Sequence, residues 1–467
     1  MHLVLALLAL LQEGKPVSTV PKMEDTVRIT LQGEFEFDYV WRRQEIVAFT
    51  RGVSGLSAPG NADSENTLEG FFALRMNIDL SDNVSAMFEL GTKRVDGGSV
   101  NFFAGPNTAG TGSLSPTLQL REAQVLFKEV FWTELSLKAG IMDWSFDPRG
   151  RGSSTAFDLR HSQRFIHALS PAGDGPLTLG RHANDPEELE PVGVWLRLAR
   201  TLMTIDLIAL PAVIEGGSVH NDESFYAIDL LYKFDSKESR IGLIVALTND
   251  PGGRSTIYTY GGALDWRGLS DGLDIYAEFY FQNGFNDSPP LASTVKVGGY
   301  AFNAGAEYVF NADLKPWIEL TFTYFSGDGD AVANGKASAF NSYESIRDLL
   351  ILEDMYTGLD WDTNYRAIKL NGGVRLHTRL KNDLKLRAIV GYASSVEPVR
   401  FAGGTTHKLG TEVDVTADWE LTKQVTINFG IGYLFGSKVL LESMGGAGAS
   451  DAERQTMLVT LGTYLRF

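Results

Sequence analysis

The feature that most constrains the fold of this chain is an alternation of apolar and polar residues that begins at Val27. The apolar residues of the first run share one parity: Val27, Ile29, Leu31, Phe35, Phe37, Tyr39 and Trp41. A period of two residues is typical of a strand with one apolar and one polar face. At about 15 residues, the run is much longer than the strands of most globular sheets. Glu34, Glu36 and Asp38 lie on its polar face, so this strand does not belong to a dry core.

The same alternation recurs along the whole chain and predicts about eighteen strands. The predicted strands are 26–43, 67–81, 83–95, 117–130, 133–146, 191–200, 202–213, 223–236, 239–249, 255–267, 272–284, 296–310, 313–326, 365–379, 382–395, 407–420, 423–437 and 453–467. Every second connection between them is tight, whereas the others include the long segments 44–66, 96–116, 147–190, 327–364 and 438–452.

Short turns at one rim and long loops at the other are typical of outer-membrane barrels. Aromatic residues are predicted near both rims, and the chain ends in an alternating segment that closes on Phe467, like the assembly signal of bacterial outer-membrane proteins. We therefore predict an all-β fold: a transmembrane antiparallel up-and-down β-barrel of about 18 strands, with short periplasmic turns and long external loops.

Composition excludes several other classes of protein. Outside the N-terminus no run of 18 apolar residues exists, which excludes a helical membrane protein. The formal net charge of −17 argues against nucleic-acid binding, which needs Lys and Arg to displace phosphate counterions. The chain has no Cys and therefore no disulfide framework. A secreted β-rich adhesin or polysaccharide lyase is the alternative from another class, and the sorted loop lengths and Phe467 argue against it.

The first eleven residues read MHLVLALLALL, which matches the apolar region of a secretory signal and is too short to span a bilayer. No Lys or Arg precedes this run, and no clear cleavage site follows it, so a short buried helix is the alternative. We expect residues 1–24 to be a signal peptide with a short linker, and residues 25–467 to form a single barrel.

Two parts of the sequence carry a more specific pattern. Residues 409–415 read LGTEVDV and residues 429–435 read FGIGYLF, while residues 137–143 read LKAGIMD and precede FDPR at 146–149. The first pair is similar to a G-x-E-x-D … G-x-G-Y-x-F hairpin of the alginate export family of outer-membrane channels. The second resembles a strand motif of that family, with Ile141 where the family has Arg. The resemblance implies an 18-stranded barrel with an Arg-lined pore for an acidic polysaccharide.

The parity of the predicted strands places charged side chains in the lumen. Four cations form a candidate basic ladder on two neighbouring strands: Lys369, Arg375, Lys385 and Arg387. Glu412 and Asp414 lie on the next strand. One interpretation is a selectivity surface for carboxylate sugars, because Arg binds carboxylates through two parallel hydrogen bonds. The alternative is that these cations pair with neighbouring acids and only satisfy the barrel wall.

Arginine also gathers at the predicted external mouth, at Arg121, Arg149 and Arg151, although the parity at Arg121 is ambiguous. We expect segment 147–190 to lie outside the bilayer with some part entering the lumen. Segment 327–364 contains a predicted amphipathic helix over residues 343–354, which either plugs the lumen or caps the rim.

No catalytic constellation, metal site or cofactor motif is predicted. The seven His are scattered, and neither H-E-x-x-H nor G-x-S-x-G occurs. We therefore expect a channel, and no enzyme, for passive passage of a saccharide, with an acidic polysaccharide such as alginate as the finer expectation. A general or organic-acid-specific porin is the alternative. Outer-membrane lipid and a saccharide or small organic solute are the expected partners, and periplasmic secretion proteins remain open.

Overall fold

The computed structural model describes most of the barrel and parts of its loops. The described residues are 27–44, 63–92, 118–142, 144, 146–148, 190–214, 223–250, 255–287, 294–328, 336–340, 342, 348–353, 363–377, 383–401, 404–436 and 455–467. Every regular element within these ranges is a strand, and none of them contains a helix long and apolar enough to cross a bilayer. The predicted signal peptide over 1–24 lies outside the described residues.

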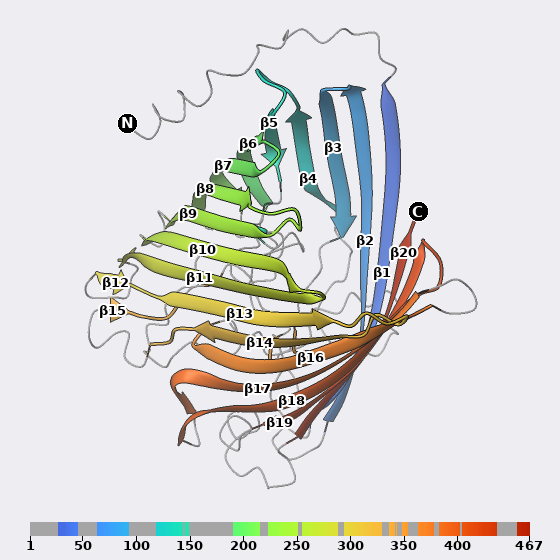
Figure 1. Ribbon diagram of the computed structural model, residues 1–467, viewed down its shortest axis with the longest axis vertical. Helices are drawn as coiled ribbons and strands as arrows, with labels where there is room; N and C mark the ends of the chain where they lie inside the picture. The colour runs from blue at the N-terminus through green and yellow to red at the C-terminus, as the bar shows by residue number, and fades with distance from the viewer. Residues whose placement is uncertain are drawn as a thin grey trace.

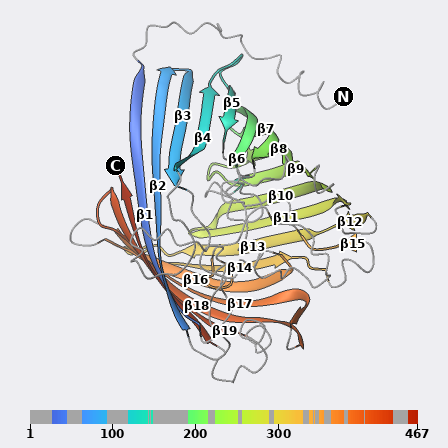
Figure 2. The same cartoon turned by 180° about the vertical axis from the view of Figure 1, so that it is seen from behind.

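The strands follow one another around a single sheet (Figures 1 and 2). The first ten are β1 (Arg28–Gln44), β2 (Asp63–Ser81), β3 (Val84–Thr92), β4 (Leu118–Phe127), β5 (Leu135–Ile141), β6 (Glu190–Ala199), β7 (Met203–Ile214), β8 (Glu223–Lys233), β9 (Arg240–Asp250) and β10 (Ser255–Ser270). The remainder are β11 (Leu273–Asn286), β12 (Val295–Val297), β13 (Tyr300–Val309), β14 (Trp317–Phe325), β15 (Lys336–Ala337), β16 (Tyr365–His377), β17 (Asp383–Phe401), β18 (Gly404–Glu420), β19 (Val425–Gly436) and β20 (Gln455–Arg466).

The sheet closes on itself because β1 pairs antiparallel with both β2 and β20. Of the twenty strands, β12 and β15 have only three and two residues and form a parallel pair at the long-loop rim, which leaves eighteen long strands in the barrel wall. Each long strand pairs antiparallel with its neighbours in chain order. The predicted closed barrel of about eighteen antiparallel strands is therefore confirmed, and closure leaves no sheet edge to be satisfied in lipid.

The connections are sorted between the two rims largely as predicted. Tight turns join β2 to β3, β10 to β11 and β18 to β19 at one rim, which the rule for outer-membrane barrels assigns to the periplasm. The opposite rim carries the long segments, but two of its connections are also short. β9 ends at Asp250 and β10 begins at Ser255, and only residues 402 and 403 separate β17 from β18.

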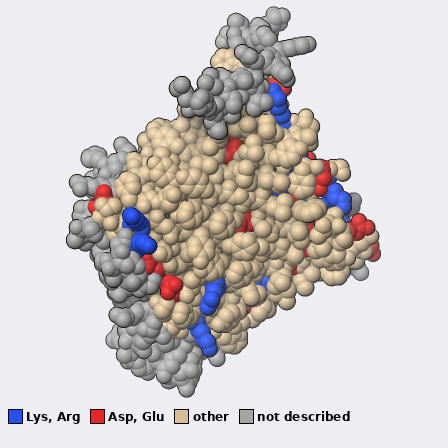
Figure 3. Space-filling view, turned by 60° about the vertical axis from the view of Figure 1, so that its left-hand side comes forward, with Lys and Arg blue, Asp and Glu red and all other residues tan. Residues whose placement is uncertain are grey.

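Burial alternates along the strands and separates a lipid face from a lumen face. On β16, Ile368 and Leu370 are 54% and 48% exposed, whereas Lys369 between them is 1% exposed. The outward side chains of the other strands are likewise mainly Leu, Val, Phe and Tyr. Figure 3 shows one face of the barrel as largely uncharged, with most Lys, Arg, Asp and Glu side chains towards its margins. An apolar band around a charged interior is the arrangement expected in a bilayer.

Two local predictions were wrong. The predicted strand 133–146 ends at Ile141, because the chain turns into the lumen from Met142 onward. On β18, the alternation predicts that Leu409 shares the outward face of Val413 and Val415, yet Leu409 is fully buried. The pairing of β17 with β18 shifts by one residue between Ala393 and Ser394, which leaves Leu409 without a partner in the register. A β-bulge of this kind moves the following side chains to the opposite face.

Candidate functional site

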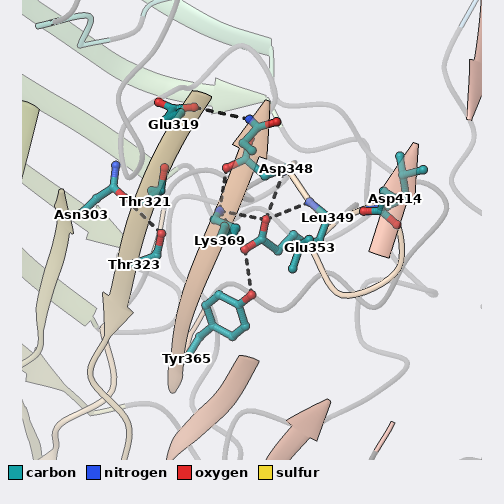
Figure 4. Close-up of polar contacts among 12 residues, drawn as sticks. Asn303, Glu319, Thr321, Thr323, Asp348, Leu349, Glu353, Tyr365, Lys369 and Asp414 are labelled. Atoms are coloured by element: carbon teal, nitrogen blue, oxygen red, sulfur yellow. Dashed lines mark hydrogen bonds and ion pairs between the residues drawn. The ribbon is translucent and has the colours of Figure 1, made fainter. Parts of the chain in front are cut away.

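A turn formed by residues 348–353, called here the inner turn, lies in the lumen against β16, β17 and β18 (Figure 4). One hydrogen bond, from the amide of Glu353 to the carbonyl oxygen of Leu349 (3.2 Å), closes it. Leu349, Ile351 and Leu352 are buried, and a Cβ atom at Gly391 of β17 would lie 2.8 Å from Leu349 Cδ1. The apolar residues of the predicted 343–354 segment therefore contact the lumen wall, but their described part is a turn and not a helix.

Two carboxyl groups of β18 hold the backbone of the inner turn. The oxygens of Glu412 accept hydrogen bonds from the amides of Ile351 (2.6 Å) and Leu352 (2.9 Å). Asp414 Oδ2 accepts from the amide of Leu350 (3.1 Å). The first N–H groups of a helical turn have no partner within the turn, so side-chain oxygens at this position satisfy them. Glu412 and Asp414 thus contact the inner turn.

Lys369 of β16 ties the side chains of the same turn to the wall. Its Nζ donates to Asp348 Oδ2 (2.6 Å) and to Glu353 Oε1 (3.1 Å), and Tyr365 donates its hydroxyl to that same Glu353 oxygen (2.8 Å). The Lys369 side chain is 1% exposed, whereas that of Asp348 is 38% exposed. At this point of the wall the group nearer to water is therefore the carboxylate, and the charge of Lys369 is turned away from the lumen.

Electrostatics keep Asp348 ionised. Burial raises the pKa of the Asp348 carboxyl group, but the positive charges of Lys369 and Arg387 outweigh burial and hold that pKa well below its ordinary range. Arg387 of β17 contributes directly, because its Nη2 lies 3.0 Å from Asp348 Oδ1 while its Nε donates to Asn371 Oδ1 (2.8 Å). The inner turn therefore carries a permanent anion fixed between two cations of the wall.

The other two cations of the predicted ladder lie nearer the short-turn rim and have different partners. Lys385 Nζ donates to Glu420 Oε1 (2.6 Å), and Arg375 Nε lies 3.7 Å from Asp383 Oδ2. Both side chains remain substantially exposed. The structure therefore brings Lys369 and Arg387 together at Asp348, and separates them from Lys385 and Arg375.

Of the three predicted mouth arginines, the structure describes only the backbone of Arg121. Arg121 lies in β4 where the pairing with β3 shifts: Glu89 faces Glu122 and Leu90 faces Leu120. That irregularity explains why the parity at Arg121 was ambiguous from the sequence. Arg149 and Arg151 lie outside the described residues, as does most of segment 147–190.

A second stretch of chain also enters the lumen directly after β5. Met142, Trp144, Phe146 and Pro148, called here the inner segment, are buried against the wall of β7 to β10. The ring centroid of Trp144 lies 5.5 Å from that of Phe225, and a Cβ atom at Gly242 would lie 2.8 Å from Phe146 Cζ. The wall can accept the Phe146 ring here because Gly242 has no side chain. Three of these four residues belong to the predicted strand 133–146, so the chain enters the lumen before the predicted loop 147–190 begins.

The sequence did not identify Asp348, Glu353 and Tyr365 as members of a site. A usable signal was present, because two acids bracket an apolar run in the DLLILE sequence of residues 348–353. When such a run lies in a loop of a barrel whose wall carries inward cations, its apolar residues can pack against the wall and its two acids can pair with the cations. The alternation along the predicted strand 365–379 also places Asn371 on the same lumen face as Lys369.

Comparisons with known proteins bear on the fold alone. No family model matches the chain, and no curated protein matches it. Among solved structures, OpdK of Pseudomonas aeruginosa, determined with vanillate, is 10% identical; the match covers 94% of this chain and 98% of that chain with a TM-score of 0.50. OccK11 (OpdR) of Pseudomonas aeruginosa is 9% identical, with 94% and 96% covered and a TM-score of 0.49. A mutant of the Rh. blastica porin is 12% identical, with 94% and 100% covered and a TM-score of 0.40.

The likeness to OpdK bears on the fold, and the closed barrel with its apolar outer face gives the class of the protein. It is a β-barrel protein of the bacterial outer membrane with the fold of porin-type channels. The resemblance to the alginate export family is not confirmed by these comparisons.

Proposed function

We propose that the protein is a passive channel for small hydrophilic solutes, saccharides or organic acids, whose lumen is narrowed by the inner turn. No covalent step is part of this proposal, since selectivity in such a pore follows from its shape and the charges along its wall. We also propose that residues 1–24 serve as the export signal that brings the chain to the outer membrane.

The observation that carries this proposal is the way in which the inner turn is fixed. A loop that only covered a rim would need no buried ion pair, yet Lys369 and Glu353 are both buried where the turn meets the wall. Burying two charges is costly unless their geometry and remaining hydrogen bonds are satisfied. Here Tyr365 and two backbone amides complete the hydrogen bonds of Glu353. A loop held in this way constricts a lumen permanently.

The proposal is tested by reconstituting the folded protein in planar bilayers and in liposomes. We expect discrete single-channel steps, and swelling rates that fall with the size of an uncharged saccharide. Heat-modifiable migration on a gel verifies in parallel that the barrel is folded. Folded protein that gives neither conductance nor swelling would contradict the proposal.

An acidic polysaccharide remains the second candidate for the solute. Arg375, Lys385 and Arg387 have exposed side-chain surface in the lumen, so we propose that these three members of the ladder contact an anionic solute, while Lys369 anchors the inner turn. Oligouronates should then reduce the current at lower concentration than neutral oligosaccharides of equal length. Equal block by both would leave only the general channel.

A further inference from the structure

A cavity of about 530 Å³ lies on the lumen side of β2 to β6, away from the inner turn. Its volume is within the range of sites that hold a small ligand. Three cations and an indole ring are among its lining side chains: Arg75, Lys138, Arg197 and Trp195. None of these four residues belongs to the ladder on β16 and β17.

The Arg197 side chain is held in place by the wall and presented to the cavity. Its Nε and Nη2 atoms donate to the two oxygens of Asp206 at 2.8 and 2.7 Å. The arginine is 42% exposed, whereas Asp206 behind it is 3% exposed. A guanidinium group has five N–H donors, so contacts from two nitrogens leave donors free for a second anion. The cation therefore lies in front of its partner, and its charge is the one that a solute meets.

Arg75 repeats this arrangement on the other side of the cavity. Its Nε donates to Glu89 Oε2 (2.8 Å), and the exposed fractions of the two side chains are 42% and 8%. In both pairs the arginine is exposed and the acid is buried, which is the reverse of the order at Lys369 and Asp348. The local field of a pore wall depends on which charge is nearer to water, so these two pairs present positive charge to the cavity. With Lys138 they outnumber the exposed carboxylate of Asp79, which also lines it.

The Trp195 ring lies beside two of these cations, Arg197 and Lys138. The guanidinium carbon of Arg197 lies 4.5 Å from the centroid of the Trp195 ring, and Lys138 Nζ lies 5.1 Å from it. Contacts of this kind with an aromatic face hold a flexible cationic side chain in place while its charged group stays exposed to water. Asn77, Ser85 and Ser136 add amide and hydroxyl groups to the lining, which suit the hydroxyl groups of a solute.

We propose that Arg75, Lys138, Trp195 and Arg197 form a binding site for a small hydroxylated carboxylate within the lumen, and that this wall sets the charge preference of the pore. The inference rests on the proposed channel function for its role in transport, although binding itself does not require conduction. The carboxylate lies against the exposed guanidinium groups of Arg197 and Arg75, and the hydroxyl groups of the solute face Asn77 and Ser136.

Gluconate is the probe, and sorbitol, which has the same carbon chain without the carboxylate, is its neutral control. Isothermal titration of the folded protein in detergent should give saturable binding of gluconate and none of sorbitol. In planar bilayers, gluconate should reduce the single-channel current and the reversal potential should indicate anion preference.

Two variants test the residues. Lys138→Gln removes one cation, and the double variant Arg197→Gln with Asp206→Asn removes both members of an ion pair. Only the buried carboxyl group of Asp229, which faces Asp206 across the sheet, then remains beside them. Each should weaken gluconate binding by about tenfold, as expected for loss of a charge-assisted hydrogen bond. Lys423→Gln removes an exposed lysine from the turn between β18 and β19 and should leave binding unchanged.

The outcomes separate the two proposals. Gluconate binding that survives in both variants, or that is lost in Lys423→Gln instead, overturns this inference and leaves the channel function standing. Absence of gluconate binding to the unaltered protein also overturns it. Gluconate binding in protein that does not conduct overturns the channel function and supports the site.

Discussion

Nζ of Lys369 lies 3.1 Å from Oε1 of Glu353, and neither side chain is exposed to solvent. One of these residues belongs to the barrel wall and the other to the inner turn, so the ion pair joins two parts of the chain that the strand pairing does not join. Removing one partner of a buried pair leaves the other charge without compensation. Undocking of the loop is therefore costly as long as both partners are present.

Replacing Lys369 with Met should release the inner turn. The uncompensated charge of Glu353 destabilises the docked position by about 3–5 kcal/mol, so the single-channel conductance should rise while the barrel remains heat-modifiable. The double variant Lys369→Met with Glu353→Gln should recover part of the original conductance. Lys385→Met is the matched control, because Lys385 pairs with a carboxylate on the same wall but remains exposed. Equal conductance in Lys369→Met and in the unaltered protein would contradict the anchoring role.

The variant Glu412→Gln should loosen the backbone of the turn. The amide side chain retains a single acceptor oxygen for the two amides of Ile351 and Leu352, and loss of one of these hydrogen bonds costs about 0.5–1.5 kcal/mol. Hydrogen exchange at these two amides should accelerate accordingly. Glu420→Gln, which changes the partner of Lys385, should leave both exchange rates as they are. Unchanged exchange in Glu412→Gln would show that other contacts hold the turn.

The inner turn should tolerate moderate acid. The pKa of Asp348 in the folded protein is held below the ordinary Asp value of about 3.9, so its ionised form stabilises the docked turn at every pH above that value. This contribution is lost only as the pH falls through the lower, folded-state pKa. The difference in conductance between the unaltered protein and Asp348→Asn should therefore stay constant from pH 8 down to about pH 4.5, with the variant the more conductive. A difference that disappears as the pH falls through about 6 would contradict this assignment.

The alternation of exposed and buried side chains predicts that the outer face of the barrel contacts lipid. Val245, in the middle of β9, is 44% exposed on the outer face, so Val245→Arg should reduce the stability of the assembled barrel by about 2–4 kcal/mol. Ser136→Arg places the same side chain on the lumen face of β5 and should assemble normally. Denaturant titration in lipid vesicles measures both. Equal tolerance of the two substitutions would mean that the outer face does not contact lipid.

The barrel itself was predictable because a strand with lipid on one face and water on the other has apolar and polar residues in alternation, and this pattern is visible in the sequence. The predicted strand 365–379, for example, corresponds to β16 over Tyr365–His377, and 223–236 corresponds to β8 over Glu223–Lys233. Alternation no longer distinguishes lipid from lumen where the parity of the apolar residues changes. Met142, Trp144 and Phe146 continue the alternation of β5, but on the parity that faces the lumen, so the same pattern meant contact with the wall and not with lipid.

The candidate site was only partly predictable because its partners are distant in sequence. Parity correctly placed Lys369 and Arg387 in the lumen, but it could not show that Asp348 from a loop lies between them. It also could not show which member of an ion pair is nearer to water. That order depends on packing: Lys369 is covered by the inner turn, whereas nothing described in the structure covers Arg197 to the same extent.

The most direct test of the account locks the inner turn in place. The chain has no Cys, so Leu350→Cys with Gly432→Cys introduces the only thiols, and the structure places Leu350 Cβ 3.3 Å from the position of a Cβ atom at Gly432. This separation is close to that of disulfide-bonded cysteines. In the Lys369→Met background, single-channel conductance should be low when the disulfide is formed and should rise on reduction. The same conductance in both states, with the disulfide verified, would contradict the claim that the inner turn narrows the pore.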